Sequence, residues 1–201
     1  AVKEKFPDTR LEAHFHQDFS LGVANTLLSL AEGVEIVHST VLGIGERSGN
    51  APTEDIVMAL LTMYGIDLGI KTEKLYPLAK LVEELSQIKV PSNKSIVGDM
   101  LYQVESGIIA NWFKNCGEEH LTELFPMRPE LVGQPTADVV MGKGSGIDSV
   151  NIWLDKIGIK TSEEEAADIL KECKALGEST KKLLTEEQFR DIVDRTISKV
   201  T

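Results

Sequence analysis

Apolar and polar residues alternate early in the chain with the periods of strands and helices in turn. Residues 11–16 (Leu-Glu-Ala-His-Phe-His) alternate apolar and polar side chains, which predicts a strand. Residues 34–41 are rich in β-branched side chains and predict a buried strand. Apolar positions at helical spacing follow each of them, over 22–33 and 52–64. The order strand, helix, strand, helix predicts two adjacent parallel strands with two helices, as in α/β proteins.

Helical periods dominate after residue 65. Two capping boxes, sequences that open helices, begin at Ser162 (Ser-Glu-Glu-Glu) and Thr185 (Thr-Glu-Glu-Gln). Several prolines between residues 126 and 135 indicate a loop-rich stretch. We expect helices over 72–85, in part of 97–115, over 149–157, from Ser162 to about Leu176 and from Thr185 onward, with one short strand at 139–141.

Composition narrows the class of protein. The 201 residues carry 21 basic and 32 acidic side chains, and a net charge of −11 argues against nucleic acid or an anionic membrane as partner. It does not exclude a small anionic substrate, because a metal or an arginine can reverse the sign within one pocket. No run approaches the ~18 apolar residues of a membrane span, and the first residues contain no apolar signal core. Two cysteines, Cys116 and Cys173, are too few for a disulfide scaffold, so we expect reduced thiols in a cytoplasmic protein.

The sequence His-Phe-His at residues 14–16 has the spacing of a metal site. Side chains two residues apart share one face of a strand, so Glu12, His14, His16 and Asp18 are expected to project together. Two imidazoles at this spacing can bind one divalent cation. A bare His-x-His pair is more commonly two surface or hydrogen-bonded histidines, so the pair needs support from its context.

The second strand provides that context. It leads into a glycine-rich loop, Gly43 to Asn50, and in a barrel the carboxyl ends of neighbouring strands meet at one rim. His14, His16 and Asn50 are therefore expected to converge there. The Asn carbonyl oxygen is a hard ligand that suits Mg²⁺, Mn²⁺ or a mixed nitrogen and oxygen zinc site.

Other features carry less chemistry. His38 lies in an apolar strand and is interpreted as a barrel histidine with its hydrogen bonds satisfied, and His120 as a surface residue. The glycines at 43–45 and 142–146 match neither a P-loop nor a dinucleotide-binding pattern, so we interpret both as structural turns.

Taken together, the motifs resemble a known family. His-x-His-x-Asp at 14–18, Ala-Asn at 24–25 and Gly-x-Gly-Glu-Arg-x-Gly-Asn at 43–50 resemble the α-isopropylmalate synthase and homocitrate synthase family. They are also similar to the related hydroxymethylglutaryl-CoA lyases. Residues 91–98, 105–108 and 140–146 resemble segments that follow the barrel in the synthases.

This resemblance implies a metal-dependent TIM barrel that makes or breaks carbon–carbon bonds. It implies that His14, His16 and Asn50 bind a divalent metal (Zn²⁺, Mn²⁺ or Mg²⁺), with Glu46 and Asp18 as the catalytic residues. The implied substrates are an acyl-CoA and a 2-oxo acid. The implied fold is the last strands and helices of a (β/α)8 barrel at 1–65, followed by mostly helical post-barrel subdomains at 66–130 and 131–201.

Three departures from the family pattern shape the expectation. The Asp-Arg-Glu segment of the family's first barrel strand has no counterpart here. Val104 and Ile109 stand where the synthases have the histidines of a His-Glu-Ser-Gly-Ile-His motif, and Gln17 replaces an asparagine. Two strands cannot close a barrel. We therefore expect the C-terminal half of a catalytic unit, whose N-terminal barrel half comes from the same precursor or from a second subunit.

Two alternative functions stay open beside the synthase reaction. One is a lyase that runs the reverse cleavage on the same metal site, which the missing histidines leave open. The other is a non-catalytic subunit that completes or regulates a barrel formed elsewhere. In each case we expect a homo-oligomer.

Overall fold

The chain divides into two compact units. The structure, a computed structural model, describes residues 1–197. Unit 1 consists of residues 1–101 and 129–135, and unit 2 of residues 102–128 and the described chain from 136 onward. These units cut across the segments expected at 66–130 and 131–201. The division of the chain into a barrel part and two post-barrel subdomains therefore stays a prediction.

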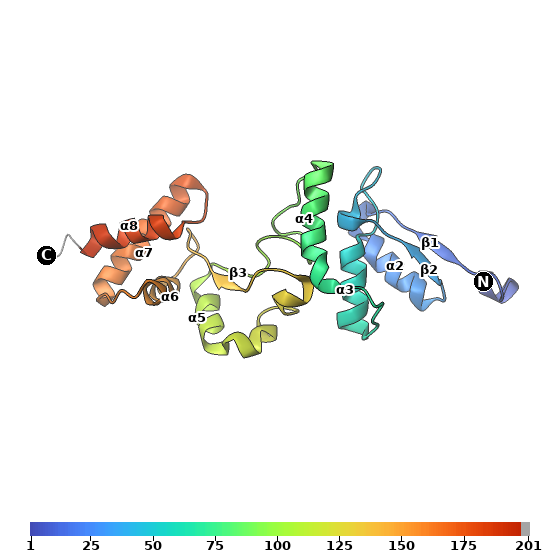
Figure 1. Ribbon diagram of the computed structural model, residues 1–201, viewed down its shortest axis with the longest axis horizontal. Helices are drawn as coiled ribbons and strands as arrows, with labels where there is room; N and C mark the ends of the chain where they lie inside the picture. The colour runs from blue at the N-terminus through green and yellow to red at the C-terminus, as the bar shows by residue number, and fades with distance from the viewer. Residues whose placement is uncertain (198–201) are drawn as a thin grey trace. The chain divides into compact units, whose positions relative to one another are not determined.

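Unit 1 contains the predicted pair of parallel strands (Figure 1). A short helix α1 (Val2–Lys5) precedes β1 (Glu12–His14), and β2 (Ile36–His38) lies parallel to it, with Glu12 opposite Ile36 and His14 opposite His38. Helix α2 (Gly22–Ala31) connects the strands, and α3 (Thr53–Tyr64) follows β2. The predicted strand–helix–strand–helix order and the parallel pairing are confirmed.

The prediction that the second strand is buried is wrong for this structure. Ile36 is 39% exposed, and both strands have exposed residues on one face. Within the described residues this sheet has two strands, and burial of a strand comes from its neighbours. The apolar core of this region lies between α2 and α3 instead, where Ile56 and Leu60 pack against Val23 and Leu27.

The remainder of unit 1 is a helix and two packed loops. The 3-10 turn η3 (Thr72–Lys74) leads into α4 (Leu75–Ser86), and a turn-rich segment covers 87–101. The 3-10 turn η5 (Pro129–Val132) returns to this region and packs on η3. Gly133 approaches so closely that an added Cβ would lie 2.1 Å from the Glu73 carbonyl oxygen, and its φ of +75° also favours glycine.

Unit 2 is mostly helical, as the sequence predicts. A pair of parallel strands, β3 (Gln103–Val104) and β4 (Asp138–Val139), is followed strand by strand by α5 (Gly107–Cys116) and α6 (Ile147–Ile157). The 3-10 turn η4 (Glu118–Glu123) follows α5. Helices α7 (Glu163–Thr180) and α8 (Glu186–Ile197) complete the unit and pack with α6 around Phe189 and Ile169. No helix in the described chain combines the length and apolar character that a membrane crossing requires.

Candidate metal centre

The two histidines of the His-x-His motif lie side by side. Their Nε2 atoms are 3.2 Å apart, and the ring centroids are 5.0 Å apart. Strand β1 ends at His14, but the backbone continues extended to His16, so both side chains leave the same face. His14 is exposed and His16 is half-buried. The structure therefore places two imidazoles as the sequence predicts.

The glycine-rich loop brings Asn50 next to His16. These two residues form an antiparallel β-bridge, flanked by hydrogen bonds from Gln17 N to Gly49 O (2.9 Å) and from Ala51 N to Phe15 O (3.2 Å). The Asn50 amide donates through Nδ2 to the Ile44 carbonyl, which leaves its Oδ1 atom for another partner. Asn50 Oδ1 and His16 Nδ1 are both buried without a hydrogen-bond partner.

Glycines give the loop its shape. Gly43 and Gly49 have φ of +68° and +81°, and an added Cβ on Gly49 would lie 2.1 Å from the Gly43 carbonyl oxygen. A Cβ on Gly45 would lie 2.4 Å from Asn50 Nδ2. Gly43 and Gly49 therefore need glycine to close the loop, and Gly45 leaves room for the Asn50 side chain.

The predicted common face of residues 12 to 18 ends at His16. Asp18 lies in the 3-10 turn η1 (Asp18–Ser20), where Phe19 has a left-handed φ of +56°. Arg47 lies in the glycine-rich loop at residues 43–50 (the rim loop). Both carboxylate oxygens of Asp18 accept hydrogen bonds from Arg47, from Nε and Nη2 at 2.7 Å each. These bonds hold the pKa of Asp18 well below its usual range, and a hydrogen bond from Ser48 lowers it further. The expectation that Asp18 projects with the histidines on one strand face is corrected, because the strand ends before it.

The other predicted residues of the rim have simpler surroundings. Glu46 is exposed in the loop, and its carbonyl oxygen accepts from Gly49 N at 2.9 Å. Gln17, which replaces the family's asparagine, accepts through Oε1 from the Gly22 amide at the start of α2 (2.8 Å). Its amide thus fixes the entry to the helix that follows the His-x-His strand.

His38 is the residue whose setting the sequence analysis missed. Its register opposite His14 places the two rings 5.5 Å apart, and its Nε2 lies 3.7 Å from Glu12 Oε2. The side chain is half exposed, not enclosed as a barrel histidine would be. The signal that could have identified this contact was the parallel register, since it puts residues 14 and 38 side by side.

The donor set fits a divalent cation. A tetrahedral Zn²⁺ ion lies about 2.0–2.1 Å from each imidazole nitrogen that binds it, so two such nitrogens must be roughly 3–3.5 Å apart. The Nε2 atoms of His14 and His16 are 3.2 Å apart. Asn50 offers a buried oxygen without a partner. Among the described residues, no group of three or more His, Cys, Asp or Glu side chains is arranged to hold a metal. Over residues 1–197 the site therefore presents two imidazoles and one amide, without a carboxylate ligand beside them.

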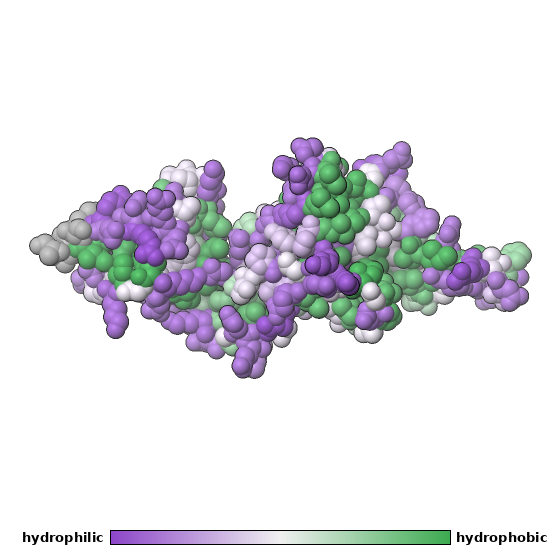
Figure 2. Space-filling model, viewed as in Figure 1, coloured by the Kyte–Doolittle hydropathy of each residue, from purple (hydrophilic) through white to green (hydrophobic). Residues whose placement is uncertain are grey.

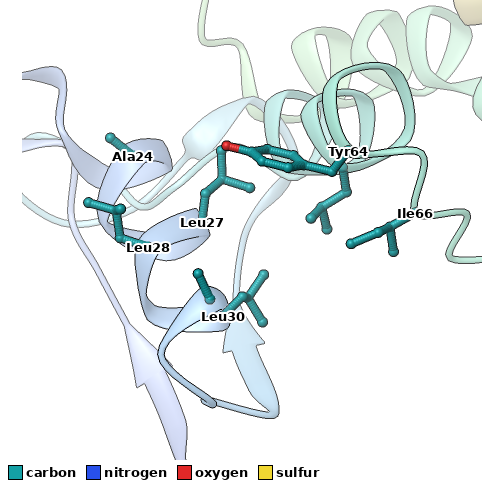
Figure 3. Close-up of a pocket in the computed structure, with 8 residues that line it drawn as sticks. Ala24, Leu27, Leu28, Leu30, Tyr64 and Ile66 are labelled. Carbon is teal, nitrogen blue, oxygen red and sulfur yellow. The ribbon is translucent and has the colours of Figure 1, made fainter.

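Two of the hollows in unit 1 differ in the chemistry of their lining. A cavity of about 570 Å³ opens beside the rim loop, with polar lining from Gln17, Ser48, Lys94 and Ser95. A second cavity, of about 450 Å³, lies between α2 and α3 and is lined by apolar side chains (Figure 3). Figure 3 shows Tyr64 of α3 reaching toward Leu27, its hydroxyl the one polar atom among the side chains drawn. Of these two cavities, the one beside the rim loop is the one lined by charged and amide side chains.

The fold and the donor set define a class: a parallel βα protein whose strand ends carry imidazole and amide donors. Residues 1–82 match the HMGL-like family. The chain is 38% identical to the 2-isopropylmalate synthase of Methanocaldococcus jannaschii (94% of this chain, 36% of the relative) and 37% identical to the homocitrate synthase AksA of that organism (98% and 47%). It is 39% identical to a protein of Archaeoglobus fulgidus named "Putative (R)-citramalate synthase CimA" (98% and 38%).

The chain is thus related to the α-isopropylmalate synthase and homocitrate synthase family, as its motifs predict. It spans between a third and a half of the length of these relatives. Two of the departures from the family pattern lie in unit 2, where Val104 is buried in β3 and Ile109 is partly exposed on α5.

Proposed function

We propose that this chain contributes His14, His16 and Asn50 to the divalent-metal centre of an enzyme that condenses an acyl-CoA with a 2-oxo acid. The observation that carries the proposal is the pair of Nε2 atoms 3.2 Å apart beside a buried Asn50 oxygen that lacks a partner. The names of the relatives support the reaction class, because they include 2-isopropylmalate and homocitrate synthases.

The bound cation would polarise the carbonyl of the 2-oxo acid and stabilise negative charge on its oxygen. The two imidazoles and the Asn50 oxygen would hold it. Glu46 is the proposed catalytic carboxylate, since it is exposed on the same loop that carries Asn50. Asp18 binds Arg47 through both oxygens, so we assign it the positioning of that arginine at the rim. The cavity beside the loop would offer the substrate polar contacts.

We propose that further barrel strands complete this site, supplied by the same precursor or by a second subunit. Strands β1 and β2 form a sheet of two among the described residues, which leaves one hydrogen-bonding edge of each strand open. Apolar side chains of α2 and α3 are also uncovered, with Leu28 65% and Tyr64 57% exposed. Both features suit the addition of neighbouring strands and helices to each side of the βα pair.

A homo-oligomer is proposed from a separate surface. Helix α4 carries a stripe of exposed apolar side chains, which Figure 2 shows as a green area over the helix. The stripe consists of Leu78, Leu81 and Leu85, at 38%, 49% and 75% exposure, and Ile88 (51%) follows just beyond the end of the helix. A continuous apolar stripe of this kind is typical of an interaction surface.

The test is metal-dependent turnover in the assembled enzyme. Acyl-CoA and a 2-oxo acid are supplied, and release of the free CoA thiol is measured with and without a chelator. We expect chelation and His14→Ala each to abolish turnover, and not merely to raise KM, because the cation is the electrophile. His120→Ala, at an exposed histidine of unit 2, is the matched control and should keep full activity. Full activity of His14→Ala in the presence of chelator would end the metal hypothesis.

A lyase remains the second candidate, because buried Val104 and the Ile109 side chain cannot carry a proton where the synthases have histidines. The same preparation, given a 3-hydroxyacyl-CoA that is a tertiary alcohol at C3 and carries a free carboxylate beyond it, would release a shorter acyl-CoA and a keto acid if cleavage is the favoured direction. If the partner alone catalyses either reaction as fast as the assembled protein does, the chain is a non-catalytic subunit.

A further inference from the structure

Glu54 is a buried carboxylate without a role in the site described above. It lies in the first turn of α3 and is 2% exposed. Its Oε2 accepts a hydrogen bond from the Leu42 amide at 3.0 Å. Its Oε1 lies 3.4 Å from Lys94 Nζ and has no hydrogen-bond partner of its own. Burial raises the pKa of Glu54, because the charged form loses its hydration.

The backbone is strained at Leu42, which directly precedes the rim loop. This residue has a left-handed φ of +61° inside the 3-10 turn η2 (Val41–Gly43), a conformation that L side chains seldom adopt. The carbonyl oxygen of the next residue, Gly43, accepts a hydrogen bond from the backbone amide of Asn50 at 2.9 Å. A contact that holds the Leu42 amide therefore also fixes the peptide against which Asn50 is placed.

Lys94 connects this carboxylate to the segment after α4. Its Nζ also lies 3.0 Å from Asp55 Oδ2, and Ser95 Oγ donates to Asp55 Oδ1 at 2.8 Å. Lys94 is only 19% exposed, so its charge offsets part of the cost of the buried Glu54. An ionisable side chain at this position costs folding free energy that an apolar residue would not, which indicates a use other than stability.

We propose that Glu54 is a positioning residue of the metal centre. By holding the Leu42 amide it keeps the rim loop closed, so that Asn50 presents its side-chain oxygen beside His16. The inference deepens the proposed function and rests on it for the role of Asn50. The state of the loop itself can be measured without metal.

Limited trypsin digestion of the metal-free protein measures the loop directly. Arg47 is an exposed cleavage site inside it, and cleavage after Arg10, outside the loop, serves as the internal reference. We expect Glu54→Ala to raise the rate of cleavage after Arg47, relative to the rate after Arg10, about tenfold. This is in line with the loss of one charge-assisted hydrogen bond. Glu54→Gln keeps an acceptor oxygen and should stay within about twofold of wild type, since a neutral bond replaces the charged one.

Two further variants separate positioning from packing. Glu54→Met fills the buried space without an acceptor, so it should open the loop as Glu54→Ala does, and it also serves if the alanine variant does not fold. Asp55→Asn is the matched control, because Asp55 also binds Lys94 but is not bonded to Leu42. The control should digest like wild type.

The second readout is Mn²⁺ affinity of the assembled enzyme, followed by electron paramagnetic resonance. We expect Glu54→Ala and Glu54→Met to weaken binding by about 10-fold to 100-fold, the usual effect of removing an outer partner of a ligand. Unchanged digestion and affinity in both variants, or equal effects in Asp55→Asn, would overturn the proposal. Absence of Mn²⁺ binding in wild type would instead refute the metal centre and Asn50's part in it, while the digestion still decides whether Glu54 holds the loop.

Discussion

At the scale of single residues, two buried polar atoms beside the His-x-His motif have no hydrogen-bond partner. Asn50 donates to Ile44 and keeps its buried Oδ1 free, and His16 keeps a buried Nδ1 free. Buried polar atoms without partners are uncommon and costly. Their position beside two imidazoles is the feature that most favours a ligand at this place.

A substitution at Gly45 tests this arrangement. An alanine Cβ would lie 2.4 Å from Asn50 Nδ2, and the backbone at 45 does not itself require glycine. We therefore expect Gly45→Ala to fold and to displace the Asn50 side chain. The metal affinity of the assembled enzyme, measured by titration calorimetry, should fall by about 10-fold to 100-fold. In a double-mutant cycle Gly45→Ala should have no further effect once Asn50→Ala is present, and an additive loss would contradict the clash.

At the scale of secondary structure, the sequence signals at helix ends act as predicted. Ser162 and Glu165 form both bonds of a capping box at the start of α7, and Thr185 and Gln188 form the same pair of bonds before α8. Each box satisfies backbone amides that the helix leaves free. The two boxes differ in one respect, because one uses a carboxylate and the other a neutral amide.

Removal of the first cap should lower the stability of unit 2. Ser162→Ala deletes the acceptor for the Glu165 amide, and loss of such a cap costs about 1 kcal/mol. Urea unfolding followed by tryptophan fluorescence measures this, because Trp112 and Trp153 are the two tryptophans and both lie in unit 2. A midpoint equal to that of wild type would show that the cap does not contribute.

The same experiment across pH distinguishes the two boxes. Hydrogen bonds from Ser162 lower the pKa of Glu165 below its ordinary value of 4.5. A lowered pKa in the folded state means that the stabilisation is present above pH 4.5 and is lost as the pH falls through the folded-state value. The stability lost in Ser162→Ala should therefore shrink on acidification. The stability lost in Thr185→Ala should not change through titration of its box, because the Gln188 side chain is neutral.

At the scale of the whole molecule, unit 1 exposes features that proteins ordinarily cover. Its sheet has two strands among the described residues, and apolar side chains of α2, α3 and α4 face solvent. Open strand edges promote pairing with other chains. The core between α2 and α3 is small, so helix packing alone gives this βα pair limited support.

We accordingly expect the isolated 201-residue chain to associate or to melt without cooperativity. Light scattering after size exclusion gives the mass, and circular dichroism gives the thermal transition. Addition of the polypeptide that carries the other barrel strands should produce a defined complex with a sharper transition. A stable monomer with one cooperative transition and no partner would contradict the proposal that the barrel is completed elsewhere.

Local sequence pattern determined the elements of this protein. Strand and helix periods, the capping boxes and the two-residue spacing of His14 and His16 act over a few positions, so they can be inferred without knowledge of the fold. The tertiary structure decided which distant groups meet. Arg47 binds both carboxylate oxygens of Asp18, His38 pairs with Glu12, and Glu54 is buried with its carboxylate bonded to the Leu42 amide. These contacts depend on register, chain reversal and desolvation, which arise only when separate segments pack together.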